Sequence, residues 1–145
     1  MEPRNLEPKD AKALLEGTEG WQYVDVRTEE EFRAGHAAGA WNVPIAVRDA
    51  SGRMALNPEF VAVMRKHFPA DARLVLGCAS GNRSQSACEI LEGEGYAHLV
   101  NLANGFLGVR DAYGRVLRPG WQAAGFPCED AAPPERTYAA LRARA

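Results

Sequence analysis

The segment Leu74–Ser84, LVLGCASGNRS, decides the fold prediction. It opens with consecutive apolar residues that end at Gly77, a pattern typical of a strand buried on both faces of a parallel sheet. Cys78 follows this strand directly, and a helix is predicted from Ser84 to Glu94. In open α/β sheets, ligands bind beside the carboxyl ends of the strands. The sequence therefore predicts a functional site in the loop that begins at Cys78.

Helical and extended patterns alternate on both sides of this segment. Thr28 with Glu31 three residues later forms a capping-box pattern, which marks a helix start. We expect helices at 8–16, 29–34, 57–68 and 84–94, strands at 21–26, 40–43, 73–77 and 98–101, and a loop at 46–56. This order predicts an α/β fold with a mostly parallel central sheet and helices on both faces.

Length and composition limit the remaining classes. A chain of 145 residues with 46% hydrophobic and 25% charged residues is typical of one globular domain. We expect that domain at residues 1–128 and a C-terminal extension at 129–145, in which 136–145 form a short helix. The net charge of −2 gives no global basic field for nucleic acid. No apolar run approaches the ~20 residues of a membrane helix, and the first residues lack the apolar run of a secretory signal.

The chain contains three cysteines, too few for a disulfide scaffold in a chain of this size. A reducing, cytoplasmic location is therefore expected.

The loop after Cys78 has the composition of an anion-binding turn. Four small residues follow the cysteine, namely Ala79, Ser80, Gly81 and Asn82, and then come Arg83 and Ser84. Small side chains let consecutive backbone N–H groups point inward at a helix N-terminus, where anions bind. The thiolate is the reactive form of cysteine, and helix N-termini and nearby cations favour it. We therefore expect Cys78 to be a nucleophile rather than a structural core cysteine.

Three segments together resemble the single-domain rhodanese family of sulfurtransferases. They are YVDVR at 23–27 with EF at 31–32 and GHAAGAWNVP at 35–44, then the loop Cys78–Ser84, then GWQAAGFP at 120–127. The match spans nearly the whole predicted domain, in the family's order. The resemblance implies a rhodanese-like fold.

The resemblance also implies the roles of individual residues. Cys78 would take a sulfane sulfur from a small anionic donor, hold it as a persulfide and pass it to a thiol or cyanide-like acceptor, which can be a protein. The backbone of Ala79, Ser80, Gly81, Asn82 and Arg83 would bind the sulfur and the donor. The supporting residues would be Asp25, Arg27, Glu31, His36 and Ser84. Arg27 and Glu31 are expected to pair across the first helix turn.

Two features bear on the substrate. Four residues separate Cys78 from Arg83, whereas phosphatases of related fold have five, so the shorter loop argues against a phosphatase or an arsenate reductase. The loop carries no lysine, which leaves both thiosulfate and 3-mercaptopyruvate open as donors. The spacer Val109–Gly120 is longer than in a minimal rhodanese, and we interpret it either as a surface loop or as a flap that helps bind an anionic donor. A protein-to-protein sulfur carrier and a non-catalytic binding module are the alternative functions.

The other cysteines and the histidines indicate no cofactor. Cys88 lies on the predicted inward face of the helix after the loop and is expected to fill the core. Cys128 is either an exposed bystander or a thiol that resolves the persulfide. The histidines are scattered without metal-ligand spacing, so we predict no metal site and no other cofactor.

Overall fold

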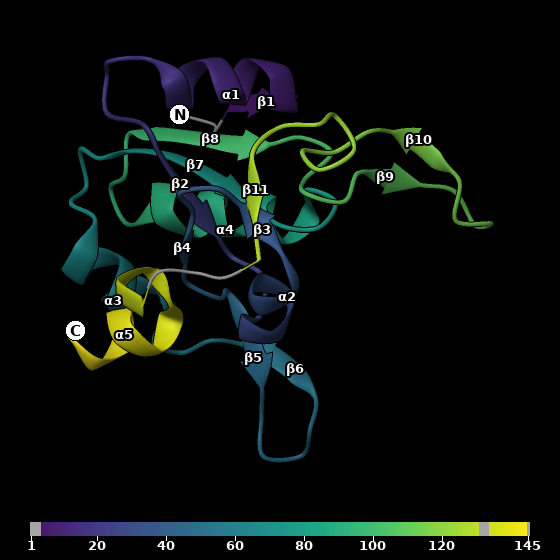
Figure 1. Cartoon of the computed structure of the whole chain (residues 1–145). Coiled ribbons are helices and arrows are strands. Elements are labelled where there is room, and N and C mark those ends of the chain that lie inside the picture. The colour runs from purple at the N-terminus through teal and green to yellow at the C-terminus, as the bar shows by residue number, and fades with distance from the viewer. Residues whose placement is uncertain (1–3, 131–133, 145) are drawn as a thin grey trace.

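The central sheet of the computed structural model, which describes residues 4–130 and 134–144, has five parallel strands in the order β1-β8-β7-β2-β4 (Figure 1). The strands are β1 (Arg4–Leu6), β2 (Gln22–Asp25), β4 (Trp41–Asn42), β7 (Arg73–Gly77) and β8 (His98–Leu102). The predicted α/β fold with a parallel sheet is confirmed. The central strand β7 ends directly before Cys78, so the loop opens at the carboxyl edge of the sheet.

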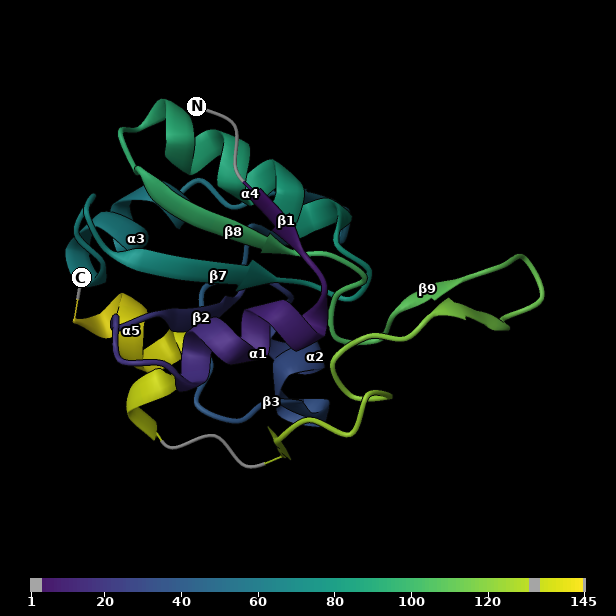
Figure 2. The same ribbon diagram turned by 90° about the horizontal axis from the view of Figure 1, so that it is seen from above.

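Helices cover both faces of this sheet. They are α1 (Pro8–Glu16), α2 (Glu29–Ala34), α3 (Phe60–His67), α4 (Asn82–Gly93) and α5 (Tyr138–Ala143). Helices α1 and α4 lie on opposite sides of β7 and β8 (Figure 2). Alternate strand residues enter two separate cores: Leu74 and Leu76 pack in a cluster with α3, α4 and α5, and Val75 packs in a cluster with α1 and α2. The unbroken apolar pattern of β7 therefore reflects burial on both of its faces.

The helix boundaries follow local signals. Helices α1 and α2 have the predicted bounds, and Thr28 and Glu31 form the predicted capping box. Helix α4 begins at Asn82 rather than Ser84, because Gly81 is its N-cap residue with φ of 105°. The helix therefore starts inside the loop and brings its first N–H groups to Cys78.

Strand pairing departs from the prediction in three places. The predicted loop at 46–56 is wrong: it is a hairpin of β5 (Ala46–Arg48) and β6 (Met54–Leu56), closed by Asp49, which accepts hydrogen bonds from the N–H groups of Ser51 and Arg53. The edge strand β1 was not predicted; its three residues pair with β8. Two short strands, β3 (His36–Ala37) and β11 (Cys128–Glu129), also pair with each other.

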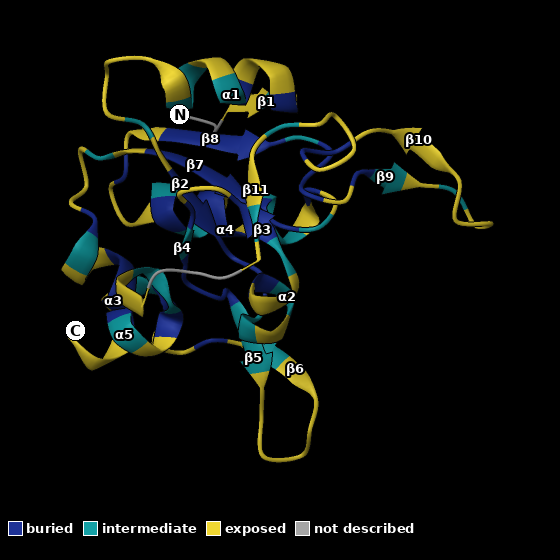
Figure 3. Ribbon diagram, viewed as in Figure 1, coloured by how far each residue is buried: buried dark blue, intermediate teal, exposed yellow. Residues whose placement is uncertain are grey.

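The spacer after residue 108 forms a second hairpin. It consists of β9 (Val109–Arg110) and β10 (Val116–Arg118), extends away from the sheet layers in Figure 1, and is mostly exposed in Figure 3. Both interpretations of this spacer assumed a loop or flap; the structure makes it a protruding two-stranded ribbon.

The C-terminal segment packs on the domain. A 3-10 turn, η1 (Pro134–Arg136), leads into α5, whose Tyr138 and Leu141 are buried in the same core as α3. The predicted boundary between 128 and 129 falls inside β11, and the division at that point stays a prediction. Residues 1–3, 131–133 and 145, which both predicted units include, lie outside the described residues. No helix in the described ranges is long and apolar enough to cross a membrane.

Candidate functional site at the Cys78 loop

Three hydrogen-bond donors converge on the sulfur of Cys78. The N–H of Gly81 lies 3.1 Å from Sγ, and the N–H and the hydroxyl of Ser84 each lie 3.3 Å from it. The cysteine itself is only 1% exposed, so these donors meet the sulfur away from bulk water. Hydrogen bonds to an ionised acceptor are stronger than those to a neutral one. The donors are therefore placed to stabilise negative charge that develops at Sγ.

Backbone contacts hold the loop from behind. The N–H of Phe106 donates to the Cys78 carbonyl at 2.7 Å, and the N–H of Leu107 donates to the Ala79 carbonyl at 2.8 Å. Gly105, with φ of 66°, makes this approach possible, because a Cβ there would lie 2.5 Å from both carbonyl oxygens. With its carbonyls turned toward this segment, the loop can present N–H groups on its other side.

The predicted binding residues surround the sulfur unevenly. Gly81 is buried, Ala79 and Arg83 are half-buried, and Ser80 and Asn82 are exposed. Asn82 and Arg83 occupy the first turn of α4, where backbone N–H groups have no partner within the helix. Anions approaching the loop from solvent would meet these N–H groups first.

Asn101 is a site residue that the sequence reasoning missed. Its Oδ1 accepts the Ser84 hydroxyl at 2.5 Å, and its Nδ2 donates to the Gly81 carbonyl at 3.2 Å and to Asn5 Oδ1 at 2.8 Å. It is buried at the carboxyl end of β8, beside β7. The signal was available: a polar residue follows Leu99 and Val100 near the carboxyl end of the strand, at the edge where the loop lies.

Arg83 is paired with Glu31, not free at the rim of the loop. Its two terminal nitrogens donate to the two carboxylate oxygens at 2.7 and 2.9 Å. The hydrogen bond from Arg83 holds the pKa of Glu31 at about 2, against an ordinary 4.5, and bonds from Thr28 assist. The expected Arg27–Glu31 pair is therefore wrong: Glu31 joins α2 to the start of α4 instead.

Asp25 and Arg27 form a buried pair at the end of β2. The Arg27 guanidinium donates to both carboxylate oxygens of Asp25, at 2.8 Å for the closest contact, and to the Gly35 carbonyl at 2.7 Å. Its charge also lies over the ring of Phe106, 4.6 Å from the centroid. A buried pair needs such additional partners to offset the loss of hydration. The pair links β2, the end of α2 and the segment behind the loop.

His36 is fully buried in a network that includes the C-terminal segment. Its ring stacks on Phe32 with centroids 3.7 Å apart, Nδ1 lies 2.7 Å from the Phe32 carbonyl, and Nε2 lies 3.0 Å from Glu129. Glu129 also forms an ion pair with the Arg136 guanidinium, at 2.7 Å. His36 thus has partners at both ring nitrogens within the fold.

The other two cysteines have different surroundings. Cys88 is buried in the α4 core, and burial raises the pKa of its thiol to about 12. Cys128 is exposed in β11, and all three cysteines are free thiols. Within the described part of the chain, no cluster of three or more His, Cys, Asp or Glu could hold a metal ion.

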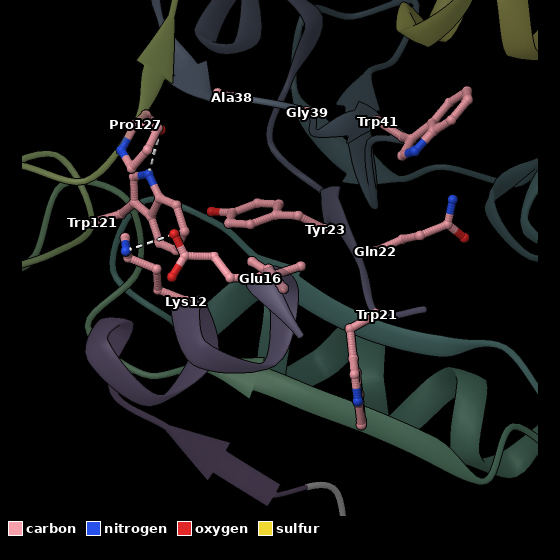
Figure 4. A pocket seen from close by; sticks show the side chains of 11 residues that line it. Lys12, Glu16, Trp21, Gln22, Tyr23, Ala38, Gly39, Trp41, Trp121 and Pro127 are labelled. Carbon is pink, nitrogen blue, oxygen red and sulfur yellow. Dashed lines mark hydrogen bonds and ion pairs between the residues drawn. The ribbon is translucent and has the colours of Figure 1, made fainter. Parts of the chain in front are cut away.

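A cavity of about 320 Å³ lies away from this loop. It is bounded by α1, the start of β2 and the segments near Ala38 and Trp121, and its lining contains no residue of 78–84 (Figure 4). The Tyr23 hydroxyl points toward Trp121, and burial raises the pKa of Tyr23 well above its usual value, so the phenol stays protonated. The cavity and the Cys78 loop are therefore separate features of the fold.

Comparisons with known proteins point to one domain family. The model of the family described as "Rhodanese-like domain" matches residues 7–112. "Thiosulfate sulfurtransferase 16, chloroplastic" of Arabidopsis thaliana is 42% identical over 87 residues, which cover 60% of this chain and 72% of that protein. "Protein HIGH ARSENIC CONTENT 1, mitochondrial" of the same plant is 36% identical over 70% of this chain, and the chain spans 59% of that relative's length.

A solved structure shows the same fold over most of the chain. The crystal structure of Rv0390 from M. tuberculosis is 29% identical, with a TM-score of 0.75 over 90% of this chain and 100% of that one. The family model covers well over half of the residues and includes the whole loop from Cys78 to Ser84. The chain belongs to the rhodanese-like domain family.

Proposed function

We propose that this chain is a sulfurtransferase that moves a sulfane sulfur from thiosulfate or 3-mercaptopyruvate to a thiophilic acceptor through a persulfide on Cys78. The observation that carries the proposal is the set of three donors, from Gly81 and Ser84, directed at Sγ. Relatives named thiosulfate sulfurtransferases support the same reaction class. These donors stabilise the thiolate on Sγ before transfer; in the persulfide the negative charge is on the outer sulfur, which the other N–H groups of the loop would hold.

With thiosulfate the step balances without a further reagent. The Cys78 thiolate attacks the outer sulfur of the donor, a new S–S bond forms on Cys78, and the S–S bond of thiosulfate breaks with its electron pair leaving on sulfite. Cyanide then takes the outer sulfur as thiocyanate and returns Cys78 to thiolate. Backbone N–H groups of the segment from Ala79 to Arg83 would hold the donor's oxygens during attack.

In this proposal Arg83 mainly positions the loop. Because Glu31 binds both of its terminal nitrogens, Arg83 positions the start of α4 more than it offers a free charge to the donor. We assign donor binding chiefly to the backbone, and orientation of the loop to Arg83. Asp25, Arg27 and His36 have structural roles, and a reducing, cytoplasmic compartment would keep the three free thiols usable.

The test is incubation of the full chain with thiosulfate or 3-mercaptopyruvate, followed by intact-mass measurement. A one-sulfur adduct that cyanide removes, and that is absent in Cys78→Ser, is the expected result. The variant Cys128→Ser should still form the adduct, and slower recovery in that variant would indicate a resolving thiol. No adduct with either donor would leave a non-catalytic binding module as the better reading.

Arsenate reduction is the second candidate, because one relative's name refers to arsenic content. The loop argues against it, since four rather than five residues separate Cys78 from Arg83. Arsenate with a thiol reductant, assayed beside thiosulfate in the same preparation, distinguishes the two. Arsenite production at a rate comparable to thiocyanate production would favour the second function.

A further inference from the structure

Exposed apolar side chains gather on the hairpin of β9 and β10. Among the described residues six large hydrophobic side chains are exposed; three of them, Tyr113, Val116 and Leu117, lie on this hairpin, and Leu107 lies two residues before it. Tyr113 at the tip is 85% exposed. The hairpin extends away from the sheet layers in both views (Figures 1 and 2). A grouped set of exposed apolar residues marks an interaction site more often than scattered ones do.

The same hairpin is basic in an acidic chain. It carries Arg110, Arg115 and Arg118 against a single acid, Asp111, whereas the chain as a whole has a net charge of −2. Arg115 is bound by Asp111 at 2.8 Å, which leaves the charges of Arg110 and Arg118 to a partner. Positive charge beside apolar side chains fits a surface that is acidic and apolar.

A groove lies beside the hairpin. It has a volume of about 260 Å³, and its lining includes Leu117 and Arg118 of the hairpin, Glu7 and Lys9 at the start of α1, and Phe126. The groove shares the apolar character of the hairpin, and its two cations, Lys9 and Arg118, outnumber its one acid, Glu7. An extended segment with acidic and apolar side chains could contact both the hairpin and the groove.

The hairpin is joined to the reactive loop at its base. Leu107 donates its N–H to the Ala79 carbonyl, one residue from Cys78. The two ends of the hairpin also lie close to each other. A Cβ on Gly108, just before β9, would lie 2.5 Å from the carbonyl oxygen of Arg118 at the end of β10. The base of the hairpin therefore lies beside the backbone of the loop that carries Cys78.

We propose that the β9–β10 hairpin and this groove are the docking surface for a protein sulfur acceptor whose reactive cysteine is surrounded by acidic and apolar residues. The proposal rests on the proposed function. In the transfer, the acceptor thiolate attacks the outer sulfur of the Cys78 persulfide and forms a new S–S bond. The persulfide bond breaks, and its electron pair returns to Cys78 as thiolate.

The test uses two synthetic peptides of equal length with one cysteine each. One carries glutamates and leucines around the cysteine, and in the other lysines replace the glutamates. The full chain is loaded with thiosulfate, and loss of its one-sulfur adduct is followed by mass. The acidic peptide should accept sulfur at least tenfold faster than the basic one, and added salt should reduce that advantage.

The hairpin has a matched control in the same chain. Val116 and Leu117 are 45% and 62% exposed, as are Met54 and Leu56 on β6. Val116→Ser with Leu117→Ser should slow transfer to the acidic peptide, whereas Met54→Ser with Leu56→Ser should not. Cyanide should discharge all three proteins equally. Equal rates with both peptides, or an unaffected hairpin variant, would overturn the docking surface.

Two further measurements separate the possible failures. Serine versions of the peptides are titrated against Cys78→Ser, so that binding is measured without chemistry. Preferential binding of the acidic peptide, in a chain that forms no adduct with thiosulfate, would reject the sulfur transfer alone. An adduct without preferential binding would reject the docking alone. The mass of the protein in solution is measured for wild type and hairpin variant. A dimer that the hairpin substitutions convert to a monomer would assign this surface to a second copy of the chain and overturn the proposal.

Discussion

Ser84 has one hydroxyl proton and two acceptors within reach. The Asn101 oxygen lies at 2.5 Å and the Cys78 sulfur at 3.3 Å. Asn101 is held in orientation by its own bonds to the Gly81 carbonyl and to Asn5, so its oxygen stays in place. The hydroxyl can therefore donate chiefly to Asn101 while the sulfur of Cys78 is neutral, and donate to the sulfur when negative charge develops there.

Ser84→Ala should slow the chemistry of Cys78 without removing it. A hydrogen bond to a charged group contributes about 1.5–3 kcal/mol, which corresponds to roughly tenfold or more in rate. We expect the alkylation of Cys78 at pH 7 and its sulfur uptake from thiosulfate to fall by about that factor. Ser86→Ala, at an exposed position on the same helix, is the control. Equal rates in the two variants would show that the backbone donors suffice.

The pair of Glu31 and Arg83 should make stability depend on pH in the acid range. The carboxylate of Glu31 stays ionised in the folded chain down to pH about 2, whereas its ordinary pKa is 4.5. The contribution is therefore fully present above about pH 4.5 and is lost as the pH falls toward 2. Because the pair is partly exposed, about 1 kcal/mol is the scale expected.

Denaturant unfolding of wild type and Glu31→Gln at pH 7 and pH 3 checks this. The difference between the two proteins should be present at pH 7 and smaller at pH 3. Glu30→Gln, which alters an exposed carboxylate on the same helix, should show little difference at either pH. A Glu31→Gln difference that does not change with pH would mean that the carboxylate contributes through packing rather than charge.

At the scale of elements, the C-terminal helix α5 is part of the main core. Leu141 is fully buried beside α3 and α4 residues, and the Tyr138 hydroxyl accepts a hydrogen bond from Asn57 at 2.9 Å. Leu141→Ala should lower the free energy of unfolding by about 2–5 kcal/mol. Ala139→Ser, on the exposed side of the same helix, is the control. If Leu141→Ala and Ala139→Ser instead unfold in single transitions with the same midpoint, residues 129–145 are an independent extension.

Elements with local signals were predictable, and elements defined by pairing were not. Helix α2 is set by Thr28 and Glu31, three residues apart, and β7 by its own apolar run. Strand β1 exists only because residues 4–6 meet β8, almost a hundred positions later. The hairpin of β5 and β6 likewise depends on partners that no short window contains. Non-local contacts override local propensity at such places.

The same distinction applies to the candidate site. The Cys78 loop was predictable because strand, small residues and helix start are consecutive. The partners of its residues come from elsewhere in the chain: Glu31 binds Arg83 across 52 positions, and Asn101 reaches Ser84 across 17. The sequence predicted Glu31 and Arg83 as site residues but assigned Glu31 to Arg27. Residue types were thus predictable, and their pairing required the fold.

At the scale of the whole molecule, Cys88 reports on global unfolding. It is fully buried between α4 and the sheet, and burial raises the pKa of its thiol to about 12. We expect alkylation of Cys88 only when the chain unfolds, whereas the exposed Cys128 should react in the folded state. The measurement is alkylation by iodoacetamide across a urea gradient, with each cysteine read by peptide mass in a Cys78→Ser background.

The raised pKa of Cys88 also sets the direction of an alkaline effect. Between about pH 9 and 12 the unfolded thiol is ionised while the folded one still holds its proton, so the folded state loses stability as the pH rises through this window. Cys88→Ala should reduce that dependence, although the lost packing of the sulfur lowers stability at every pH. The comparison is therefore the slope of unfolding free energy against pH in wild type and variant, not its absolute value. Identical slopes would show that Cys88 does not contribute to the pH dependence. Rapid alkylation of Cys88 without denaturant would show that the α4 core opens locally, and the cysteine would then report on that helix rather than on the molecule.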